Sequence, residues 1–456
     1  MRVLLIKPPS QNQKTFSLPL GLAYIASYLE KNNHHVKIID SRASKYKKKD
    51  IRKEIKKIDP DVVGVTAISK TLFDAFDVVK MVKDYSPNCL TVLGGPHPTV
   101  RAKETLKVCK DVDIIVRGEG EQTFADILEK YEAKNGNDFS KVQGISFREN
   151  KKIIQTEDRP PIADLDDLPI PAYHLLNMDD YKYWYRLLTE FEFEKNSIPF
   201  SHMITSRGCP NNCAFCASRA LWGKTYRCRS PGNIIDELKI LKDRYKRKVI
   251  DITDDTFTLD KKRTIKLCNL IRKEDFDISF ICCTRANLFD KEIATALKKA
   301  GFNIIYFGLE SGVQKTLNYL SKGLTVEDSI NAVKNAKNAG LKVVANFIIG
   351  IPGETKKDIN TTIDFAKKLN LNHTSFTILL PFPGTKIYDD AKINNPLLSK
   401  EWDRYTYANI SSLMNVPGLS NTELKGLLYK AHILCNFTPS GIFFDLFKEI
   451  PVKGLL

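Results

Sequence analysis

The stretch Ser206–Cys216, SRGCPNNCAFC, carries three cysteines in a Cx3Cx2C spacing. An apolar run that ends near Ser206 predicts a strand directly before it, and Gly208 and Pro210 shape the loop. Three thiolates on one short loop can wrap one corner of a cube-shaped [4Fe–4S] cluster. A complete structural site needs four ligands, so three leave one iron open for chemistry. The three candidate metal ligands and catalytic residues are Cys209, Cys213 and Cys216.

Two other interpretations of these cysteines stay open. A zinc site would need a fourth ligand from a histidine or a distant cysteine, and Cys228 lies twelve residues beyond Cys216. Three core cysteines could also fall together by chance, but their tight spacing at a strand end speaks against it. The cluster interpretation accounts for all three thiols and for the loop that carries them.

The composition is that of an ordinary globular protein. Of the 456 residues, 43% are hydrophobic and 27% are charged, which excludes a disordered tail, a collagen and a small disulfide scaffold. The formal net charge is +16, and a positive net charge is common among nucleic-acid-binding proteins. The lysines are spread over the whole chain and the densest run, Lys45–Lys49, is short, so a solvated surface explains the charge as well.

The sequence shows no sign of a membrane segment. No apolar run approaches the about 18 residues that a spanning helix needs. The N-terminal stretch MRVLLIKPP is shorter than a signal peptide and has the pattern of a strand. We therefore expect the protein in the cytoplasm, where its ten cysteines serve as metal ligands or core residues rather than in disulfides.

Residues 1–145 alternate strand and helix patterns, with helices expected at Leu20–Lys31 and Thr71–Tyr85. This alternation predicts an α/β fold with an open, doubly wound, Rossmann-like parallel sheet, whose ligands bind outside the carboxyl ends of the strands. The expected strands are Arg2–Ile6, Val36–Ile39, Val62–Thr66, Leu90–Leu93 and Ile114–Val116. Glycines in the turns after them let backbone N–H groups approach a ligand closely. The candidate ligand-binding residues there are Ser69, Gly94, Gly95, His97, Gly118 and Glu119.

A second β/α series follows an expected linker at 146–195, whose last part, Tyr181–Phe193, is unusually aromatic. Over 196–390, six strands are expected to end near Ser206, Thr253, Thr284, Gly308, Gly350 and Leu380. The helices expected between them are Asn233–Tyr245, Lys261–Glu274, Asp290–Ala300, Val326–Ala339 and Thr355–Leu369. Six repeats are too few for a closed eight-stranded barrel, so we expect a partial (β/α)6 TIM-like barrel with its site at the strand carboxyl ends. Residues 391–456 are expected to form a small, mainly helical region with a helix at Asn421–Leu434.

The cysteine loop, with Phe215 directly before its third cysteine, resembles the signature of the radical S-adenosylmethionine (radical SAM) superfamily. The resemblance implies that the open iron binds the amino and carboxylate groups of SAM. One electron from the cluster then splits SAM into methionine and a 5′-deoxyadenosyl radical, which takes a hydrogen atom from the substrate. The resemblance also implies that Phe215 lies against the adenine, and that an external electron donor of the flavodoxin or ferredoxin type is a partner.

Later strand ends match positions at which this superfamily binds SAM. The resemblance implies contacts to the amino group after the second strand, to ribose and carboxylate after the fourth, and a close backbone approach to adenine after the fifth. The matching residues are Asp254, Asp255, Arg285, Asn287, Glu310, Ser311 and Gly353. Each of them could instead serve in a turn or a helix cap, as Asp254 would before a helix.

The whole chain resembles the subgroup of radical SAM proteins that carry an N-terminal cobalamin-binding domain. The stretches that carry this resemblance are Leu18–Leu29, Leu93–Pro98, Arg117–Phe124, Asp254–Thr258 and Tyr306–Gly312. Many cobalamin domains use Asp-x-His-x-x-Gly to bind cobalt from below, but none of the seven histidines here has Asp two places before it. The subgroup commonly lacks this histidine. His97 could be a ligand, but its Gly-Gly-Pro turn favours a packing or hydrogen-bonding role.

The resemblance implies a cobalamin-dependent enzyme that methylates an unactivated carbon or phosphorus, using SAM both to methylate cobalamin and to form the radical. Oxidative cyclases and carbon–carbon coupling enzymes of the same subgroup are the alternative. A methylthiotransferase acting on tRNA or a ribosomal protein fits the charge, but it needs three N-terminal cysteines for a second cluster. Residues 1–145 contain only Cys89 and Cys109. A nucleic-acid-binding sensor is disfavoured because no helix-turn-helix or zinc-finger pattern is present, and no DNA partner is expected.

The substrate is expected to be a small molecule. Trp402, Tyr405 and the apolar tail Ile442–Phe447 hint at an apolar or lipid-like compound. The same residues could equally be ordinary packing at the end of the chain.

Overall fold

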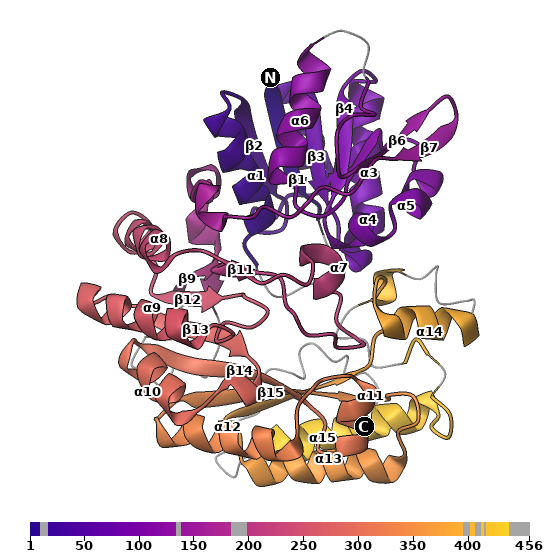
Figure 1. Ribbon diagram of the computed structural model, residues 1–456. Coiled ribbons are helices and arrows are strands. Elements are labelled where there is room, and N and C mark those ends of the chain that lie inside the picture. Colours follow the sequence, from indigo (N-terminus) through magenta and orange to yellow (C-terminus); the bar gives the residue numbers. More distant parts are fainter. Residues whose placement is uncertain are drawn as a thin grey trace. The chain divides into compact units, whose positions relative to one another are not determined.

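The computed structural model describes residues 1–9, 17–133, 138–183, 198–394, 402–405, 412–414 and 416–436. The chain divides into two compact units (Figure 1). Unit 1 comprises Met1–Tyr181, Ala217–Arg227 and Glu401–Arg404, and unit 2 comprises Lys182–Cys216, Cys228–Lys400 and Tyr405–Leu456. None of the helices in the described ranges is long and apolar enough to cross a membrane.

Unit 1 contains a seven-stranded sheet in the order β2-β1-β3-β4-β5-β6-β7. The five expected strands are present and parallel, which confirms the doubly wound sheet. They are β1 (Arg2–Lys7), β2 (His35–Asp40), β3 (Val62–Thr66), β4 (Leu90–Gly94) and β5 (Ile114–Val116). The strand order reverses between β1 and β3, and ligands of such sheets bind at the carboxyl ends beside that point.

A hairpin that the sequence analysis did not predict extends this sheet. Strands β6 (Ile145–Glu149) and β7 (Lys152–Gln155) pair antiparallel, and β6 pairs antiparallel with β5. The two turn residues, Asn150 and Lys151, both have positive φ, of 47° and 67°. Two-residue turns of this kind match the twist of the strands they join, and asparagine tolerates the left-handed conformation. The segment from 146 to 155, expected as linker, is therefore sheet.

Helices α1 to α5 connect the parallel strands of unit 1, and crossovers of this kind are right-handed by rule. Helices α1 and α6 pack together, and α2 packs on α3. Their bounds are α1 (Leu20–Lys31), α2 (Lys48–Ile58), α3 (Leu72–Tyr85), α4 (Pro96–Val100), α5 (Ala102–Val108) and α6 (Glu121–Glu132). The short helix α7 (Ser218–Trp222), which follows the cysteine loop, also belongs to unit 1. Helix α2 begins within the lysine run noted in the sequence and contains Lys48 and Lys49; its Ile51 and Ile55 are buried and its lysines are exposed.

Unit 2 contains a curled sheet in the order β16-β15-β14-β13-β12-β9-β8. Six of its strands are parallel, as the partial-barrel prediction requires, and β8 pairs antiparallel at one edge. The strands are β8 (Lys182–Tyr183), β9 (Ile198–Met203), β12 (Val249–Ile252), β13 (Ser279–Thr284), β14 (Phe302–Glu310), β15 (Lys342–Ile349) and β16 (His373–Ile378). Two further short strands are β10 (Ser206–Arg207) and β11 (Arg227–Cys228).

The long helices of unit 2 lie along the outer side of the curled sheet (Figure 1). The long ones match the sequence prediction within two residues at each end. They are α8 (Pro231–Asp243), α9 (Lys261–Glu274), α10 (Lys291–Lys299), α12 (Val326–Asn338), α13 (Lys356–Leu369) and α15 (Asn421–Asn436). The shorter α11 (Gln314–Tyr319) and α14 (Lys386–Asn394) were not predicted. Capping side chains fix several N-termini, such as Thr325 before α12 and Thr355 before α13.

Helix α15 protects the open edge of the unit 2 sheet. The Asn436 side chain accepts a hydrogen bond from Thr374 N and donates one to Thr374 O, both at 2.8 Å. These bonds occupy one residue of the edge strand β16, and His432 Nε2 lies 3.1 Å from the Phe376 carbonyl oxygen. Covered edges cannot pair with other chains. Helix α15 therefore covers part of the edge of the sheet that carries the site.

A testable consequence concerns Gly95, which has a φ of 99° and precedes α4. A Cβ there would lie 2.7 Å from Thr66 Oγ1 and 2.8 Å from the Ala67 carbonyl oxygen. We expect Gly95→Ala to lower the free energy of unfolding by about 2 kcal/mol or more, because the backbone strain adds to the clash. The matched control, Gly21→Ala on the exposed side of α1, should raise it by about 0.5–1 kcal/mol. Urea unfolding of both variants measures the difference, and equal stabilities would contradict the expectation.

Candidate functional site

The three cysteines of the loop differ from most of the others in exposure. Cys209 and Cys213 are partly buried and Cys216 is exposed, all on the segment between β10 and α7. By contrast, four core cysteines are buried, namely Cys89, Cys109, Cys268 and Cys282. Within the described residues, no three His, Cys, Asp or Glu side chains stand together in a geometry that could hold a metal ion. The thiols of the loop are therefore accessible and share one segment without converging on one point.

Asp254 holds the chain at the entrance to the loop. Its carboxylate accepts hydrogen bonds from Thr205 N at 2.7 Å, Thr205 Oγ1 at 2.5 Å and Ser206 Oγ at 2.6 Å. Asp254 is 2% exposed, so its carboxylate is buried and its hydrogen-bond donors come from within the protein. It does not cap a helix, because the N-cap of α9 is Asp260, which accepts from Arg263 N at 3.0 Å. Asp254 thus fixes the direction in which the chain enters the cysteine loop.

Two buried arginines hold the same entrance from the other side. Arg229 Nη1 donates to the Ile204 carbonyl oxygen at 3.0 Å, and Arg263 Nη2 donates to the Thr205 carbonyl oxygen at 2.8 Å. Arg229 also forms a buried ion pair with Glu237, whose side chain is fully buried. Buried charges of this kind are stable only when paired and hydrogen-bonded. The strand end before the first cysteine is therefore anchored by charged groups on both sides.

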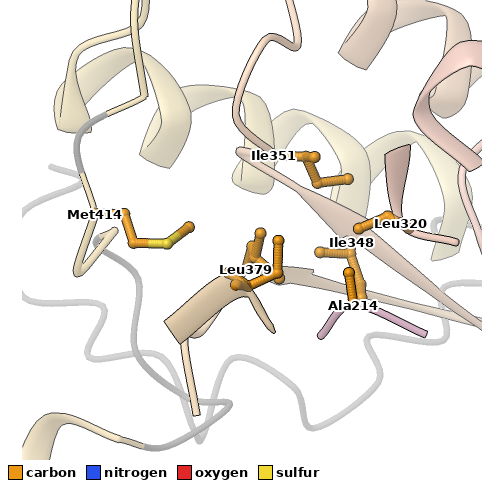
Figure 2. Close-up of a cluster of buried hydrophobic side chains, with 7 residues drawn as sticks. Ala214, Leu320, Ile348, Ile351, Leu379 and Met414 are labelled. Atoms are coloured by element: carbon orange, nitrogen blue, oxygen red, sulfur yellow. The ribbon is translucent and has the colours of Figure 1, made fainter. Parts of the chain in front are cut away.

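The middle of the loop is anchored by apolar packing and two backbone hydrogen bonds. Ala214 N donates to Leu320 O at 2.8 Å, and Ile387 N donates to Ala214 O at 3.0 Å. Ala214 lies in a cluster of buried apolar side chains, beside Leu320 and Ile348 in Figure 2. The cluster comprises Ala214, Leu320, Ile348, Ile351, Leu379, Ile387 and Met414, with Phe215 packed against it. The backbone between the second and third cysteines is therefore tied to the body of unit 2.

Two N–H donors reach the thiols themselves. Arg285 Nη1 lies 3.5 Å from Cys213 Sγ, and Asn211 Nδ2 lies 3.3 Å from Cys209 Sγ. Hydrogen bonds to ligand sulfurs are a regular feature of iron–sulfur sites. Three accessible thiols on one loop, two of them with N–H donors, therefore form a donor set that suits a [4Fe–4S] cluster.

A buried ion pair lies beside this loop. Lys322 Nζ and Glu310 Oε1 are 2.6 Å apart, and both side chains are less than a tenth exposed. Burial alone would lower the pKa of Lys322, but the Glu310 carboxylate and the Cys213 sulfur raise it above its usual value. The ammonium also lies 5.7 Å from the centre of the Phe215 ring. Sequence analysis missed Lys322. The available signal was the sequence Ser321-Lys322-Gly323, whose serine and glycine are typical of turns; in the structure both have positive φ.

The other predicted SAM contacts fall into two groups. Ser311 has no exposed surface, and its hydroxyl lies 3.0 Å from Thr362 Oγ1 and accepts from Val313 N. By contrast, Asp255 and Gly353 are exposed, and a Cβ at Gly353 would meet nothing within 4 Å. Asn287 donates to the Gly323 carbonyl oxygen at 3.2 Å. Ser311 therefore ties its loop to α13, while Asp255 and Gly353 are accessible to a ligand.

Two carboxyl groups with raised pKa were not predicted. Glu354 Oε2 accepts from Gly350 N at 2.9 Å and Ile351 N at 3.2 Å, and burial raises the pKa of this side chain to about 7. Asp251 lies on β12 in register with His202 of β9, so both point to the same face of the sheet. Burial raises the pKa of Asp251 to about 7 as well. Both groups can exchange a proton near neutral pH.

In unit 1, the structure brings Ser69 and His97 together at the carboxyl edge of the sheet. Ser69 Oγ lies 3.0 Å from His97 Nδ1, and the histidine is 3% exposed. The Trp402 ring packs edge-on against it, with the ring centres 4.6 Å apart. Burial, with a smaller effect from Arg101, lowers the pKa of His97 to about 4, so the ring is neutral at pH 7. Of the two roles considered for His97, these contacts match packing and hydrogen bonding.

Gly118 and Glu119 border a cavity at the carboxyl end of β5. The cavity has a volume of about 660 Å³ and is lined by residues of unit 1 alone, among them Thr99, Asp158 and Trp222. The Glu119 carboxylate accepts from Arg227 Nη1 at 2.9 Å and 3.0 Å and from Ile162 N at 2.7 Å. It therefore joins the segment after β7 to the start of β11. Gly94 similarly uses its carbonyl oxygen to accept from Ala67 N at 2.9 Å.

Some predicted features lie outside the described residues, namely most of the aromatic stretch Tyr181–Phe193 and all of Ile442–Phe447. Tyr181 itself is buried and donates to Asp40 Oδ2 at 2.9 Å. Tyr405 packs against Phe382 with ring centres 6.0 Å apart.

Two family models match the chain. The model of the radical SAM superfamily matches residues 203–366, and that of the B12 binding domain matches residues 12–128. An uncharacterized methyltransferase of Pyrococcus horikoshii is 40% identical over the whole chain and 98% of its own length. Anaerobic magnesium-protoporphyrin IX monomethyl ester cyclase of Rubrivivax gelatinosus is 26% identical over 89% of this chain and 71% of its own. Cytidylyl-2-hydroxyethylphosphonate methyltransferase of Streptomyces wedmorensis is 28% identical over 92% of this chain and 87% of its own length.

The fold is also similar to that of a solved structure. The radical S-adenosylmethionine methyltransferase TsrM from Kitasatospora setae, solved with cobalamin and a [4Fe–4S] cluster, superposes with a TM-score of 0.75. The match covers 96% of this chain and 89% of TsrM at 16% sequence identity. The similarity extends over both units and supports the arrangement of a doubly wound sheet followed by a partial barrel.

The role of Asp254 can be tested by removing its carboxylate. In Asp254→Ala, the buried Thr205 N–H loses its acceptor, and we expect the free energy of unfolding to fall by about 2–4 kcal/mol. The loop entrance should also become loose, so the variant should retain clearly less iron after reconstitution. The control is Asp277→Ala, which removes an exposed carboxylate paired with Lys248 and should leave the iron content unchanged. Full iron in Asp254→Ala would show that the loop does not need this anchor.

The buried neutral His97 predicts a pH dependence. Its pKa is lower in the folded protein than in the unfolded chain, so the unfolded state binds more protons between about pH 6.5 and pH 4. Stability is therefore lost as the pH falls through this window, by about 2 kcal/mol between pH 7.5 and pH 5 from this residue. His97→Gln should reduce the pH slope of the unfolding free energy, whereas His35→Gln, at an exposed site, should not. Equal pH slopes of the unfolding free energy in the two variants would contradict the lowered pKa of His97.

Proposed function

Because the chain belongs to the radical SAM enzymes that carry a B12-binding domain, we propose that it methylates an unactivated carbon or phosphorus centre of a small molecule. The cofactors of this family are a [4Fe–4S] cluster, SAM and cobalamin. When bound, they supply a one-electron cleavage of SAM and a methyl group. The observation that carries the proposal is the anchored loop with its three accessible thiols, in a chain whose other unit is a doubly wound, B12-binding type of sheet.

We propose that Cys209, Cys213 and Cys216 hold the cluster. Their support comes from the spacing, from the exposure of the thiols and from the N–H donors at two of the sulfurs. Phe215 is held between the apolar cluster and the Lys322 ammonium, which suits a flat aromatic surface for adenine. The accessible Asp255 and Gly353 are further candidates for SAM contact.

Three predicted residues have a different role in this proposal. The side chains of Asp254, Ser311 and Glu119 are occupied by contacts within the protein. We propose that they position the loops around the cofactors instead of touching them. Arg285 and Glu310 fit either role, contact with SAM or positioning of the loop, because both are buried next to the cysteine loop.

For cobalamin, we propose the carboxyl edge of the unit 1 sheet. Gly118 is exposed there and leaves open space around its backbone, and the cavity beside it has room for peripheral groups of a large ligand; Gly94 and Gly95 lie at the end of the neighbouring strand β4. His97 is held by Ser69 and Trp402 and is therefore a wall of this edge in the proposal, with no role as cobalt ligand.

The alternative is an oxidative cyclase or a carbon–carbon coupling enzyme of the same family. It is favoured by the similarity to the ester cyclase of Rubrivivax gelatinosus over most of both chains. We further propose that the protein acts in the cytoplasm with a flavodoxin or ferredoxin as electron donor, on a small-molecule or lipid-like substrate.

The cluster assignment is tested with paired cysteine variants. Cys213→Ala should lose the cluster and the cleavage of SAM to 5′-deoxyadenosine, while cobalamin still co-elutes with the protein. Cys228→Ala should keep the cluster and the cleavage of SAM, because Cys228 would matter only as the fourth ligand of a zinc site. Iron and zinc content, visible spectra and gel filtration under anaerobic conditions measure these properties. Normal SAM cleavage in Cys213→Ala, or loss of the metal in Cys228→Ala, would overturn the assignment.

The choice between methyl transfer and cyclisation is tested by product stoichiometry. If SAM is used both as methyl donor and as radical source, S-adenosylhomocysteine and 5′-deoxyadenosine should rise in equal amounts when a small-molecule extract is added as substrate source. A cyclase would increase 5′-deoxyadenosine alone. Quantifying both nucleosides by chromatography decides between the two reactions.

A further inference from the structure

We propose that Arg285 and the buried Lys322–Glu310 pair are positioning residues that set the ease with which the cluster is reduced. Arg285 contacts Cys213 Sγ, and the three charged groups together place net positive charge beside the cysteine loop. The inference rests on the proposed placement of the cluster on the three loop cysteines and deepens it. It assigns a role to Lys322, which the sequence analysis did not single out.

Arg285 ties three segments of unit 2 together. It follows β13 directly and is 5% exposed. One nitrogen of its guanidinium donates to Cys213 Sγ at 3.5 Å, and the other donates to the carbonyl oxygens of Lys322 and Gly323. The planar, branched guanidinium suits this bridging role, which a lysine could not reproduce. The end of β13, the turn after α11 and the cysteine loop therefore depend on one side chain.

The Lys322–Glu310 pair is enforced by the backbone. Glu310 has a φ of 65°, in the left-handed region that a non-glycine residue occupies only at a cost. A Cβ at Gly308 would lie 2.6 Å from Glu310 Oε1 and 2.9 Å from Lys322 Nζ, so only glycine leaves room for the pair. The Glu310 carboxylate at the end of β14 and the Lys322 ammonium are therefore held together, and the carbonyl oxygen of Lys322 also accepts from Arg285.

The electrostatic consequence follows from the charges. Arg285 and Lys322 together carry two positive charges and Glu310 carries one negative charge, which leaves a net charge of +1 within a buried region. Reduction adds one electron from the external donor to the cluster, and no bond forms or breaks in this step. Buried positive charge and N–H donors at the sulfurs stabilise the more negative, reduced form. Salt screens such buried charges much less than surface charges.

Three substitutions separate this role from simple packing, because they change the local charge in opposite directions. Arg285→Gln and Lys322→Met each remove one positive charge and should make reduction harder. Glu310→Gln removes the negative charge and should make reduction easier. The matched control is Lys315→Met, which removes an exposed lysine on α11 that pairs with Asp358.

The measurement is the midpoint potential of the reconstituted full-length protein, by a redox titration followed by electron paramagnetic resonance without SAM. We expect Lys322→Met to lower the ratio of reduced to oxidised cluster about tenfold, which for one electron is about 59 mV more negative. Arg285→Gln should shift the potential in the same direction, Glu310→Gln in the opposite direction, and Lys315→Met not at all.

Shifts of the same sign in Lys322→Met and Glu310→Gln, or unchanged potentials at full cluster content, would overturn the inference and leave the cluster placement intact. If Arg285→Gln fails to hold the cluster, the opposed pair Lys322→Met and Glu310→Gln still decides the question. An unaltered cluster signal in Cys213→Ala would instead overturn the placement itself, so the two failures can be told apart.

Discussion

The cysteine loop contains no helix or strand between β10 and α7, so contacts with other parts of the chain must hold it in place. The Asp254 carboxylate binds the entrance, and Ala214 anchors the middle between Leu320 and Ile387. Arg285 reaches one of the sulfurs. Because every one of these anchors lies at or beyond the carboxyl end of a strand of the unit 2 sheet, the curled sheet and the loop are mutually dependent. The position of a metal centre on this loop therefore depends on the barrel as a whole.

The charged anchors differ from ordinary surface ion pairs. Arg229–Glu237 and Lys322–Glu310 are buried pairs, and removing one partner from such a pair leaves an uncompensated charge at a cost of several kcal/mol. Such pairs contribute little net stability compared with apolar packing. Their presence next to the loop is therefore better explained by the geometry and the local charge that they impose on the site.

Unit 1 builds its edge in another way. Gly118 exposes the backbone at the end of β5, and the polar side chains nearby have partners within the unit. Trp402, from the C-terminal part of the chain, packs on His97 within this unit. The edge thus offers backbone groups and a cavity that is lined largely by polar and charged side chains.

Most of the secondary structure and the cysteine loop were predictable from the sequence, because they depend on residues a few positions apart. Helix periodicity, strand runs ended by glycine or proline, and the Cx3Cx2C spacing are all of this local kind. The β6–β7 hairpin was missed even though its Asn-Lys turn is local, because lysine is an unusual residue with positive φ.

The roles of individual site residues depended on the tertiary structure. The sequence by itself determined which residues could bind a cluster or a nucleotide, since chemistry follows from residue type. It could not show that Asp254 turns inward to Thr205, that Ser311 is buried, or that Lys322 lies beside Phe215. These contacts join residues that follow different strands and turns, and only the pairing and packing of the folded chain bring them together.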